Sequence, residues 1–406
     1  MSRPASAGGA AGLRPWPFVV TFGIVSLLAD VVYEGARSIT GPLLASLGAS
    51  ATVVGVVTGA GEAAALGLRL IFGPLADRTG RFWTLTITGY ALTAVTVPLL
   101  GAAGVLWAAC VLVIAERTGK AVRSPAKDTL LSHATAATGR GRGFGVHEAL
   151  DQTGAVIGPL AVAGILAVTG NDYTPALAVL AAPGIAAVLL LLWLRARVPD
   201  PLDAYENDGE PAAGPPVRGA RLPRAFWTYA AFTGVTTTGL ATFGVLSYHL
   251  VTRRLLAPDA VPVLYAGAML TAGLAALATG WLYDRTGART LAVLPLLTAA
   301  VPALAFAHTL PAAVAGSLLW GAALGMQEST LRATVADLVP AGRRATAYGI
   351  FAGVLGVASL AGGTLTGALY AVSVPALIIV VAVLQAAALI LLATTGSTTR
   401  ARPGDA

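Results

Sequence analysis

Charged side chains are scarce in this sequence, and this scarcity decides the class of protein. Asp, Glu, Lys and Arg make up 11% of the 406 residues, whereas 56% are hydrophobic. An average water-soluble domain carries roughly a quarter charged residues, so the composition excludes a water-soluble globule. One membrane span uses about 20 apolar residues, and a chain of this length has room for about a dozen spans. The sequence therefore predicts an all-α membrane protein that crosses the bilayer many times.

Cysteine is nearly absent: the only one is Cys110, within the apolar run WAACVLVIA. A single cysteine can form neither a disulfide framework nor a cysteine metal site. The sequence also lacks a Walker loop, a Gly-x-Ser-x-Gly motif and a His-Glu-x-x-His helix. We therefore expect no cofactor, no metal site and no enzymatic activity. We relate the net charge of +7 to membrane topology, because basic residues flank membrane spans, and expect no nucleic-acid partner.

Apolar segments separated by Gly, Pro or charged residues predict twelve membrane-spanning helices. Six precede a polar segment at 196–224 and six follow it, at 18–46, 51–75, 82–101, 105–131, 144–169, 174–195, 225–251, 262–283, 290–308, 312–337, 345–371 and 375–395. The polar segment is rich in Pro, Gly and charge, which predicts a flexible linker. We therefore expect two pseudo-symmetric six-helix bundles, at 18–195 and 225–395, with tails at 1–17 and 396–406.

Lys and Arg residues are distributed unevenly between the two predicted sides of the membrane. Seventeen of the 26 fall in the tails, the linker and the connections of one side, and only Arg253 and Arg254 fall on the other. Cytoplasmic connections carry the excess of basic residues in membrane proteins. This bias predicts that both tails and the linker are cytoplasmic, in a multi-pass protein of the cell inner (plasma) membrane.

A short loop sequence occurs twice. GPLADRTGR at 73–81 follows the second predicted span, and GWLYDRTGAR at 280–289 follows the eighth, 207 residues later. The repeat implies two bundles in parallel orientation. In transporters built from such repeats, the substrate binds between the halves near the bilayer midplane.

The repeated loop resembles the signature of the major facilitator superfamily, in which Gly, three residues, Asp-Arg, any residue and Gly follow one another. The resemblance implies two six-helix bundles, transport by alternating access, and a contact that holds the cytoplasmic gate shut in the outward-facing state. In that contact Asp77 and Asp284 would face the positively polarised N-terminal ends of spans 11 and 5, and Gly73 and Gly280 would allow close packing. The gating residues implied in this way are Gly73, Asp77, Arg78, Gly80, Arg81, Gly280, Asp284 and Arg285.

The fifth predicted span carries Gly145, Gly154 and Gly158-Pro159. This spacing is similar to the antiporter motif of drug-exporting members of the superfamily. Small residues also allow close helix packing in membranes, and Pro159 can bend the helix. Helix packing alone and a function specific to antiporters are thus two interpretations of this motif with about equal support.

Ionisable residues inside the predicted spans cost at least about 2.5 kcal/mol each at the bilayer centre. We therefore expect them to face the bundle interior. Asp30, Glu34 and Arg37 share one face of the first span. The candidates for proton coupling are Glu34, Glu62 and, as a third choice, Asp30. The candidates for substrate binding are Tyr33, Arg37, Glu116, Arg117 and Glu328.

A structural role is the alternative for several of these charges. Pairs between helices would hold the N-terminal bundle together, for example Arg69 or Arg123 neutralising Asp151. The charge network expected from this reasoning comprises Arg69, Lys120, Arg123, Glu148 and Asp151.

These features predict a secondary transporter that works by alternating access without ATP. The leading hypothesis is proton-coupled export, by antiport, of a small organic or amphipathic compound. The alternative is proton-coupled uptake, by symport, of an organic anion, which the basic residues on spans 1, 2 and 4 would bind. A non-transporting membrane scaffold or sensor is a third hypothesis, but it leaves the repeated loop unexplained. The expected partners are a small-molecule substrate, protons and the lipid bilayer, and the expected state is a monomer.

Overall fold

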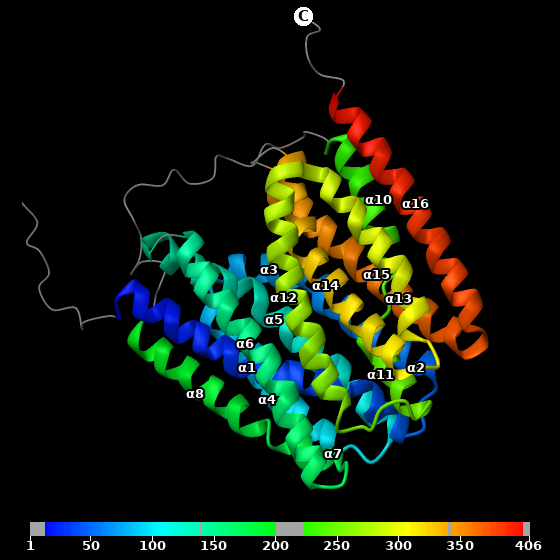
Figure 1. Cartoon of the computed structure of the whole chain (residues 1–406). Coiled ribbons are helices and arrows are strands. Elements are labelled where there is room, and N and C mark those ends of the chain that lie inside the picture. The colour runs from blue at the N-terminus through cyan, green and yellow to red at the C-terminus, as the bar shows by residue number, and fades with distance from the viewer. Residues whose placement is uncertain (1–12, 139, 200–221, 340–342, 401–406) are drawn as a thin grey trace, which may run out of the picture.

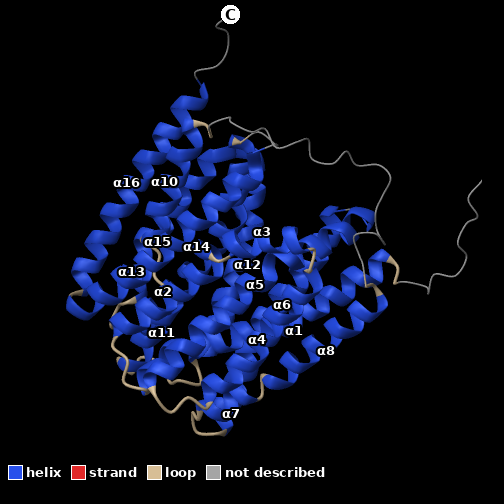
Figure 2. Ribbon diagram, turned by 180° about the vertical axis from the view of Figure 1, so that it is seen from behind, coloured by secondary structure: helices blue, strands red, loops and turns tan. Residues whose placement is uncertain are grey.

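The computed structural model describes residues 13–138, 140–199, 222–339 and 343–400, and every regular element in these ranges is a helix (Figure 2). A helix satisfies its own backbone hydrogen bonds, which lipid cannot do, so an apolar chain of this kind folds into helices. The predicted tails and the linker fall largely outside the described residues.

The described part of the N-terminal half, residues 13–138 and 140–199, contains eight helices. They are α1 (Pro15–Ser46), α2 (Ala51–Gly67), α3 (Arg69–Thr79), α4 (Phe82–Gly101), α5 (Leu106–Thr138), α6 (Arg140–Val168), α7 (Tyr173–Ala178) and α8 (Ala181–Arg197). The described part of the C-terminal half, residues 222–400, contains α10 (Arg224–Thr238), α11 (Phe243–Thr252), α12 (Val261–Thr286), the 3-10 helix η1 (Gly287–Ala292), α13 (Val293–Ala305), α14 (Leu310–Leu338), α15 (Arg344–Val372) and α16 (Val374–Arg400).

Nine helical segments of the described chain are long and apolar enough to cross a membrane, which makes this a multi-pass membrane protein. One of the nine, Val261–Ala305, is a 45-residue run that contains α12, η1 and α13. Two of the twelve predicted spans, 105–131 and 225–251, have no counterpart among the nine segments. Helix α5 is long, but many of its residues are charged, and α10 and α11 are separate short helices interrupted at residues 239–242.

Packing within each half is tight, and several pairs of helices join the two halves. Helix α1 packs on α6, and α4 on α5, whereas α12 packs on α14. Between the halves, α2 lies along α15, α6 along α12, and the C-terminal part of α1 against α11. Figure 1 shows that the ends where the chain enters α1 and α10 lie far apart, while α2, α7 and α11 gather at the opposite end of the molecule. The halves therefore converge at the α11 end and diverge at the end where α1 begins.

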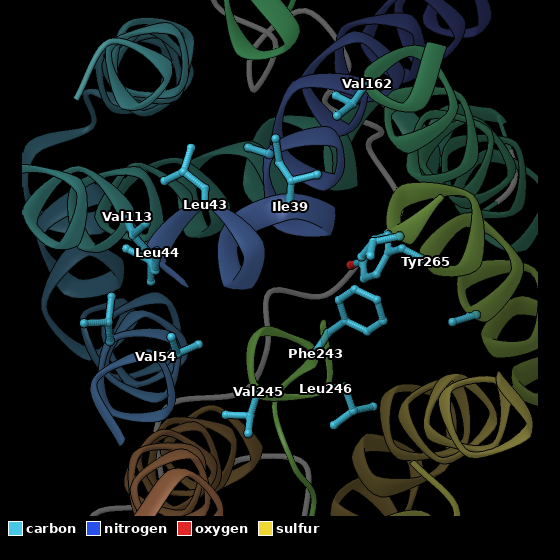
Figure 3. Close-up of a cluster of buried hydrophobic side chains, with 14 of the residues drawn as sticks. Ile39, Leu43, Leu44, Val54, Val113, Val162, Phe243, Val245, Leu246 and Tyr265 are labelled. Atoms are coloured by element: carbon cyan, nitrogen blue, oxygen red, sulfur yellow. The ribbon is translucent and has the colours of Figure 1, made fainter. Parts of the chain in front are cut away.

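Glycines bring the two halves into backbone contact at the α11 end. A Cβ atom on Gly41 of α1 would overlap the carbonyl oxygen of Gly244 in α11, and one on Gly55 of α2 would overlap that of Gly363 in α15. The hydroxyls of Thr58 and Thr242 are 2.8 Å apart across the same boundary. A buried apolar cluster surrounds these contacts and includes Ile39, Leu43, Leu44, Val54, Phe243, Val245, Leu246 and Tyr265 (Figure 3). This end of the molecule is closed.

The substitution Gly41→Val is expected to open the α11 end. The added side chain has no room beside Gly244, and overpacking a close contact costs about 1–3 kcal/mol. We expect at least about a fivefold rise in the labelling rate of Thr242→Cys by an impermeant maleimide added on the α11 side, in a Cys110→Ser background. Gly164→Val is the matched control, since nothing lies within 4 Å of a Cβ there. An unchanged rate in Gly41→Val would show that this contact does not limit opening.

Candidate functional site

A cavity of about 140 Å³ lies between the two halves. The N-terminal half contributes mainly charged groups to its wall, and the C-terminal half mainly apolar and uncharged polar groups. The residues that line it include Tyr33, Arg37, Glu62, Arg69 and Lys120 from the first half and Thr237, Trp320, Leu324, Gln327, Glu328, Phe351 and Leu355 from the second. The structure thus brings predicted substrate and coupling residues from α1, α2 and α14 to one cavity, together with Lys120 of α5 from the expected charge network. Glu34, Glu116 and Arg117 do not line it.

Helical spacing explains how α1 and α5 present their polar side chains together. Tyr33 and Arg37 are four residues apart on α1, and Arg117 and Lys120 are three apart on α5, so each pair shares one helix face. Helix α5 packs against both α1 and α2. Three helices therefore direct ionisable groups toward the same place.

Three cationic side chains converge on the hydroxyl of Tyr33. Arg117 donates a hydrogen bond to it through Nη1, Lys120 Nζ lies 3.0 Å away, and Arg37 Nη1 lies 3.4 Å away. The guanidinium carbon of Arg117 is also 4.4 Å from the centre of the Tyr33 ring, and Lys120 Nζ is 4.1 Å from it. The negative face of an aromatic ring attracts cations at this range, so Tyr33 holds the cations together without neutralising them.

Three carboxylates surround the same group of cations. Glu62 Oε1 is 2.8 Å from Arg37 Nη2 and 3.5 Å from Arg117 Nη1. Glu116 Oε2 is 3.3 Å from Arg117 Nε. Glu34 Oε1 is 3.7 Å from Arg37 Nη1. With Arg37, Arg117 and Lys120 charged, the cluster balances three positive groups against three carboxylates.

Glu34 also links the two halves of the molecule. Its Oε2 accepts a hydrogen bond from the hydroxyl of Tyr265, which lies on α12 in the C-terminal half. Glu34 is 8% exposed and Tyr265 is fully buried. One carboxylate is thus bonded at once to the charged cluster through Arg37 and to the opposite half through Tyr265.

Sequence reasoning missed Tyr265, Trp320 and Phe351. Each lies within a long apolar run, where an aromatic residue gives no signal that it faces a cavity. Trp320 and Phe351 line the cavity because of the faces that α14 and α15 turn inward. Tyr265 lies outside the lining and acts through its hydrogen bond to Glu34, and no charged residue near it on α12 marks that face.

The expected charge network divides into separate contacts. Arg69 donates to the Ala65 carbonyl at 3.1 Å and to Ser124 Oγ at 3.3 Å. Arg123 donates to Thr93 Oγ1 at 2.9 Å, and its guanidinium carbon lies 4.6 Å from the centre of the Tyr90 ring. The expectation that Arg69 or Arg123 neutralises Asp151 was wrong, because the nearest basic group to Asp151 in the described chain is His147, whose Nε2 lies 3.6 Å from Oδ2.

Two other members of that network also lie elsewhere. Glu148 is exposed and accepts a hydrogen bond from Gln152 Nε2 at 3.2 Å, so it faces away from the network. Lys120 belongs to the cluster around Tyr33 instead. Asp30 lies on α1 against α6, where its Cβ would be 3.0 Å from a Cβ on Gly154. Asp30 therefore adjoins the Asp151 group and does not line the cavity.

The repeated loop is exposed at the end where the halves diverge. Gly80 ends α3 with a φ of 63°, and Gly287 follows α12 with a φ of 60°, a conformation that favours glycine. Asp77 and Asp284 are exposed, and no ion pair joins either to another described residue. A Cβ on Gly73 would meet only Pro125, at 4.0 Å, and one on Gly280 would meet nothing within 4 Å.

Neither Gly73 nor Gly280 is closely packed in this conformation, and the close packing expected in the outward-facing state stays a prediction. The two halves diverge at this end (Figure 1). The start of α3 still touches α15, where a Cβ on Gly349 would lie 3.0 Å from Leu70 Cδ2. The remaining residues of the repeat, Arg78, Arg81 and Arg285, are also exposed, and the Arg285 guanidinium carbon lies 3.6 Å from the centre of the Trp281 ring.

Two of the three glycines in the fifth predicted span pack against α1. A Cβ on Gly154 would overlap the Leu27 carbonyl oxygen, and one on Gly158 would overlap that of Val31. In contrast, a Cβ on Gly145 would meet no atom of the described residues within 4 Å, and Pro159 is buried in the middle of α6. Helix packing accounts for Gly154 and Gly158 but leaves Gly145 unexplained.

Comparison with known proteins points to one family of transporters. Residues 22–256 and 250–405 match the model of the Major Facilitator Superfamily. An uncharacterized protein of Mycobacterium tuberculosis is 62% identical over 384 residues, which cover 94% of this chain and 93% of that protein. An uncharacterized MFS-type transporter of Methanocaldococcus jannaschii is 23% identical over 361 residues, 87% of this chain and 89% of that protein.

Solved structures with the same fold are transporters. A POT family transporter in complex with 5-aminolevulinic acid superposes with a TM-score of 0.76 at 13% identity, over 95% of this chain and 97% of that one. A nucleoside transporter superposes with a TM-score of 0.69 at 13% identity, over 95% of this chain and all of that one. At these identities the likeness concerns the fold.

Proposed function

Since the chain belongs to the major facilitator superfamily, and is therefore a transporter and not an enzyme, we propose that it moves a small organic compound across the membrane by alternating access coupled to protons. The observation that carries this proposal is the bonding of Glu34. This buried carboxylate is joined to the charged wall of the central cavity through Arg37 and to the opposite half through Tyr265. A change in the charge of Glu34 would alter both its ion pair with Arg37 and its hydrogen bond with Tyr265.

The proposed architecture is two six-helix bundles, at 18–195 and 225–395, with twelve spans. Support comes from counting α5 as one span, α10 with α11 as another, and Val261–Ala305 as two. The tails at 1–17 and 396–406 and the linker at 196–224 would be cytoplasmic, in the plasma membrane of the cell, with the protein a monomer. The arginine distribution supports this topology. With this topology, the end at which the two halves diverge faces the cytoplasm, so the present conformation is open to the cytoplasm.

Glu34 is the proposed proton carrier, with Glu62 and then Asp30 as the next candidates. An ionised Glu34 accepts the Tyr265 hydrogen bond and attracts Arg37. Protonation would remove the attraction to Arg37 and weaken the bond to Tyr265, because hydrogen bonds to charged groups are the stronger ones. The halves could then separate more easily at the α11 end. Proton binding would thus favour one conformation over the other, as coupling requires.

Export by antiport is the proposed direction, supported by the Gly-rich spacing of α6 that resembles the motif of exporting members. Uptake of an organic anion by symport is the second candidate, supported by Arg37, Arg69 and Lys120 in the cavity wall. Net flux in sealed vesicles with an imposed pH gradient separates the two. Small organic substrates also fit the structural relatives, one of which is described in complex with 5-aminolevulinic acid.

The repeated loop is proposed to form the cytoplasmic gate in the opposite conformation. Asp77→Asn is expected to reduce the transport rate by about tenfold or more while leaving expression near normal, because a neutral side chain interacts more weakly with a helix N-terminus. The measurement is initial flux per mole of purified protein in proteoliposomes. Asp259→Asn, on the connection at the other end of the molecule, serves as the control. A near-normal rate in Asp77→Asn would count against the gate.

A further inference from the structure

In the part of the chain that the structure describes, Lys120 is the cation of the cavity cluster that has no carboxylate within 4 Å. Arg37 and Arg117 each lie within 4 Å of at least one glutamate. Among the described residues, the polar contact of Lys120 Nζ is the neutral Tyr33 hydroxyl at 3.0 Å, and no carboxylate lies within 4 Å of it. Lys120 is half-buried and lines the cavity.

An ammonium group in this position is unfavourable without a negative partner. Ionisable groups inside membrane spans pair with one another or mark the path of a substrate or ion. Lys120 donates to a hydroxyl that already accepts from Arg117, so the hydroxyl cannot satisfy all the donors of the three cations. The local arrangement therefore has spare cationic hydrogen-bond donors that face the cavity.

The opposite wall of the cavity suits an apolar group. Trp320, Leu324, Phe351 and Leu355 of the C-terminal half form much of it. The volume of about 140 Å³ is close to that of apolar protein cavities that bind a single benzene ring, which are about 150 Å³. Three basic side chains, Arg37, Arg69 and Lys120, line the cavity beside two glutamates, Glu62 and Glu328. Glu34 and Glu116, which complete the charge balance of the cluster, lie outside the lining.

We propose that Lys120 and Tyr33 bind the anionic group, a carboxylate or a phosphate, of an amphipathic substrate whose apolar body lies against Trp320 and Phe351. Lys120 would supply the charge that the ligand neutralises. The Tyr33 hydroxyl would donate to the ligand as the cations reorient toward it. This inference rests on the proposed transport function and adds the chemical class of the substrate, whatever the direction of transport.

Thermal unfolding of the purified protein in detergent tests the proposal without any need for transport. The probes are phenylacetate, phenylphosphonate, the neutral phenylacetamide and the cationic phenethylamine, each at millimolar concentrations. We expect at least one of the two anions to raise the melting temperature more than phenylacetamide and phenethylamine do. A larger shift with phenylacetate indicates a carboxylate substrate, and a larger shift with phenylphosphonate indicates a phosphate.

Variants then assign the effect to Lys120. In Lys120→Met the concentration of anion that gives half of the shift should rise at least about tenfold, the ratio that corresponds to a single charged hydrogen bond. Lys120→Arg should retain the shift, and Tyr33→Phe should lose part of it. Lys127→Met is the matched control, because it removes the same charge from the same helix but contacts His147 outside the cavity wall.

Two results would overturn the proposal. One is equal stabilisation, or none, by the anions and phenylacetamide in the wild-type protein. The other is an anion effect that Lys120→Met leaves intact. A protein that transports a neutral compound yet shows no anion effect refutes the anion site alone. A protein that binds the anions through Lys120 but shows no flux under any gradient keeps the site and refutes the transporter function.

Discussion

Glu34→Gln is expected to abolish transport driven by a pH gradient while preserving exchange of substrate across the membrane. Glutamine can still accept a hydrogen bond from Tyr265 and nearly keeps the shape of glutamate, but it cannot carry a proton. The uphill flux that an imposed gradient drives should fall to the background of empty liposomes. Counterflow of labelled against unlabelled substrate, which needs no proton, should continue.

The comparison of these two assays in the same proteoliposomes separates coupling from folding. Glu148→Gln is the matched control, because it makes the same change on an exposed side chain of the same half of the molecule. Loss of gradient-driven flux in Glu62→Gln but not in Glu34→Gln would indicate that Glu62, and not Glu34, carries the proton. Full gradient-driven flux in both variants would refute proton coupling through this cluster.

Arg117→Met is expected to be the most destabilising single change in the cavity cluster. Arg117 is 7% exposed and contacts Glu116, Glu62 and the Tyr33 hydroxyl. Removing one partner of a buried ion pair leaves the other charge uncompensated and costs about 3–5 kcal/mol. Methionine keeps an apolar, unbranched stem but lacks the guanidinium group, so the loss would combine charge, hydrogen bonding and the packing of that group. We expect a large fall in melting temperature and in the yield of folded protein.

A second change should restore part of this loss. Glu116 is 7% exposed, and its Oε1 has no hydrogen-bond partner among the described residues. The double variant Glu116→Gln with Arg117→Met removes one stranded charge and should melt at a higher temperature than Arg117→Met alone. Arg285→Met is the control, since Arg285 is exposed and its ring contact with Trp281 is worth about 1 kcal/mol or less. A double variant no more stable than Arg117→Met would show that Glu116 is not the group left uncompensated.

The sequence by itself determined the class of the molecule, because the relevant signals are local or repeated along the chain. The low charge and the long apolar runs predicted a helical multi-pass membrane protein. The loop repeated at 73–81 and 280–289 indicated the superfamily, which the family comparison confirmed. Helical spacing also predicted correctly that Glu34 and Arg37 would share one face of α1. These inferences need only the period of a helix and the free energy of moving side chains into lipid.

Only the tertiary structure decided which charges meet. Spacing along one helix fixes the face on which a side chain lies, but it leaves open the rotation and the depth of that helix against its neighbours. Glu62 contacts Arg37 across 25 residues of sequence, and Glu34 contacts Tyr265 across 231. The packing of α5 on α1 likewise brought Lys120 to Tyr33, across 87 residues. The packing of α1 between α5, α6 and α11 sets these pairings, and that packing depends on apolar contacts from the whole chain.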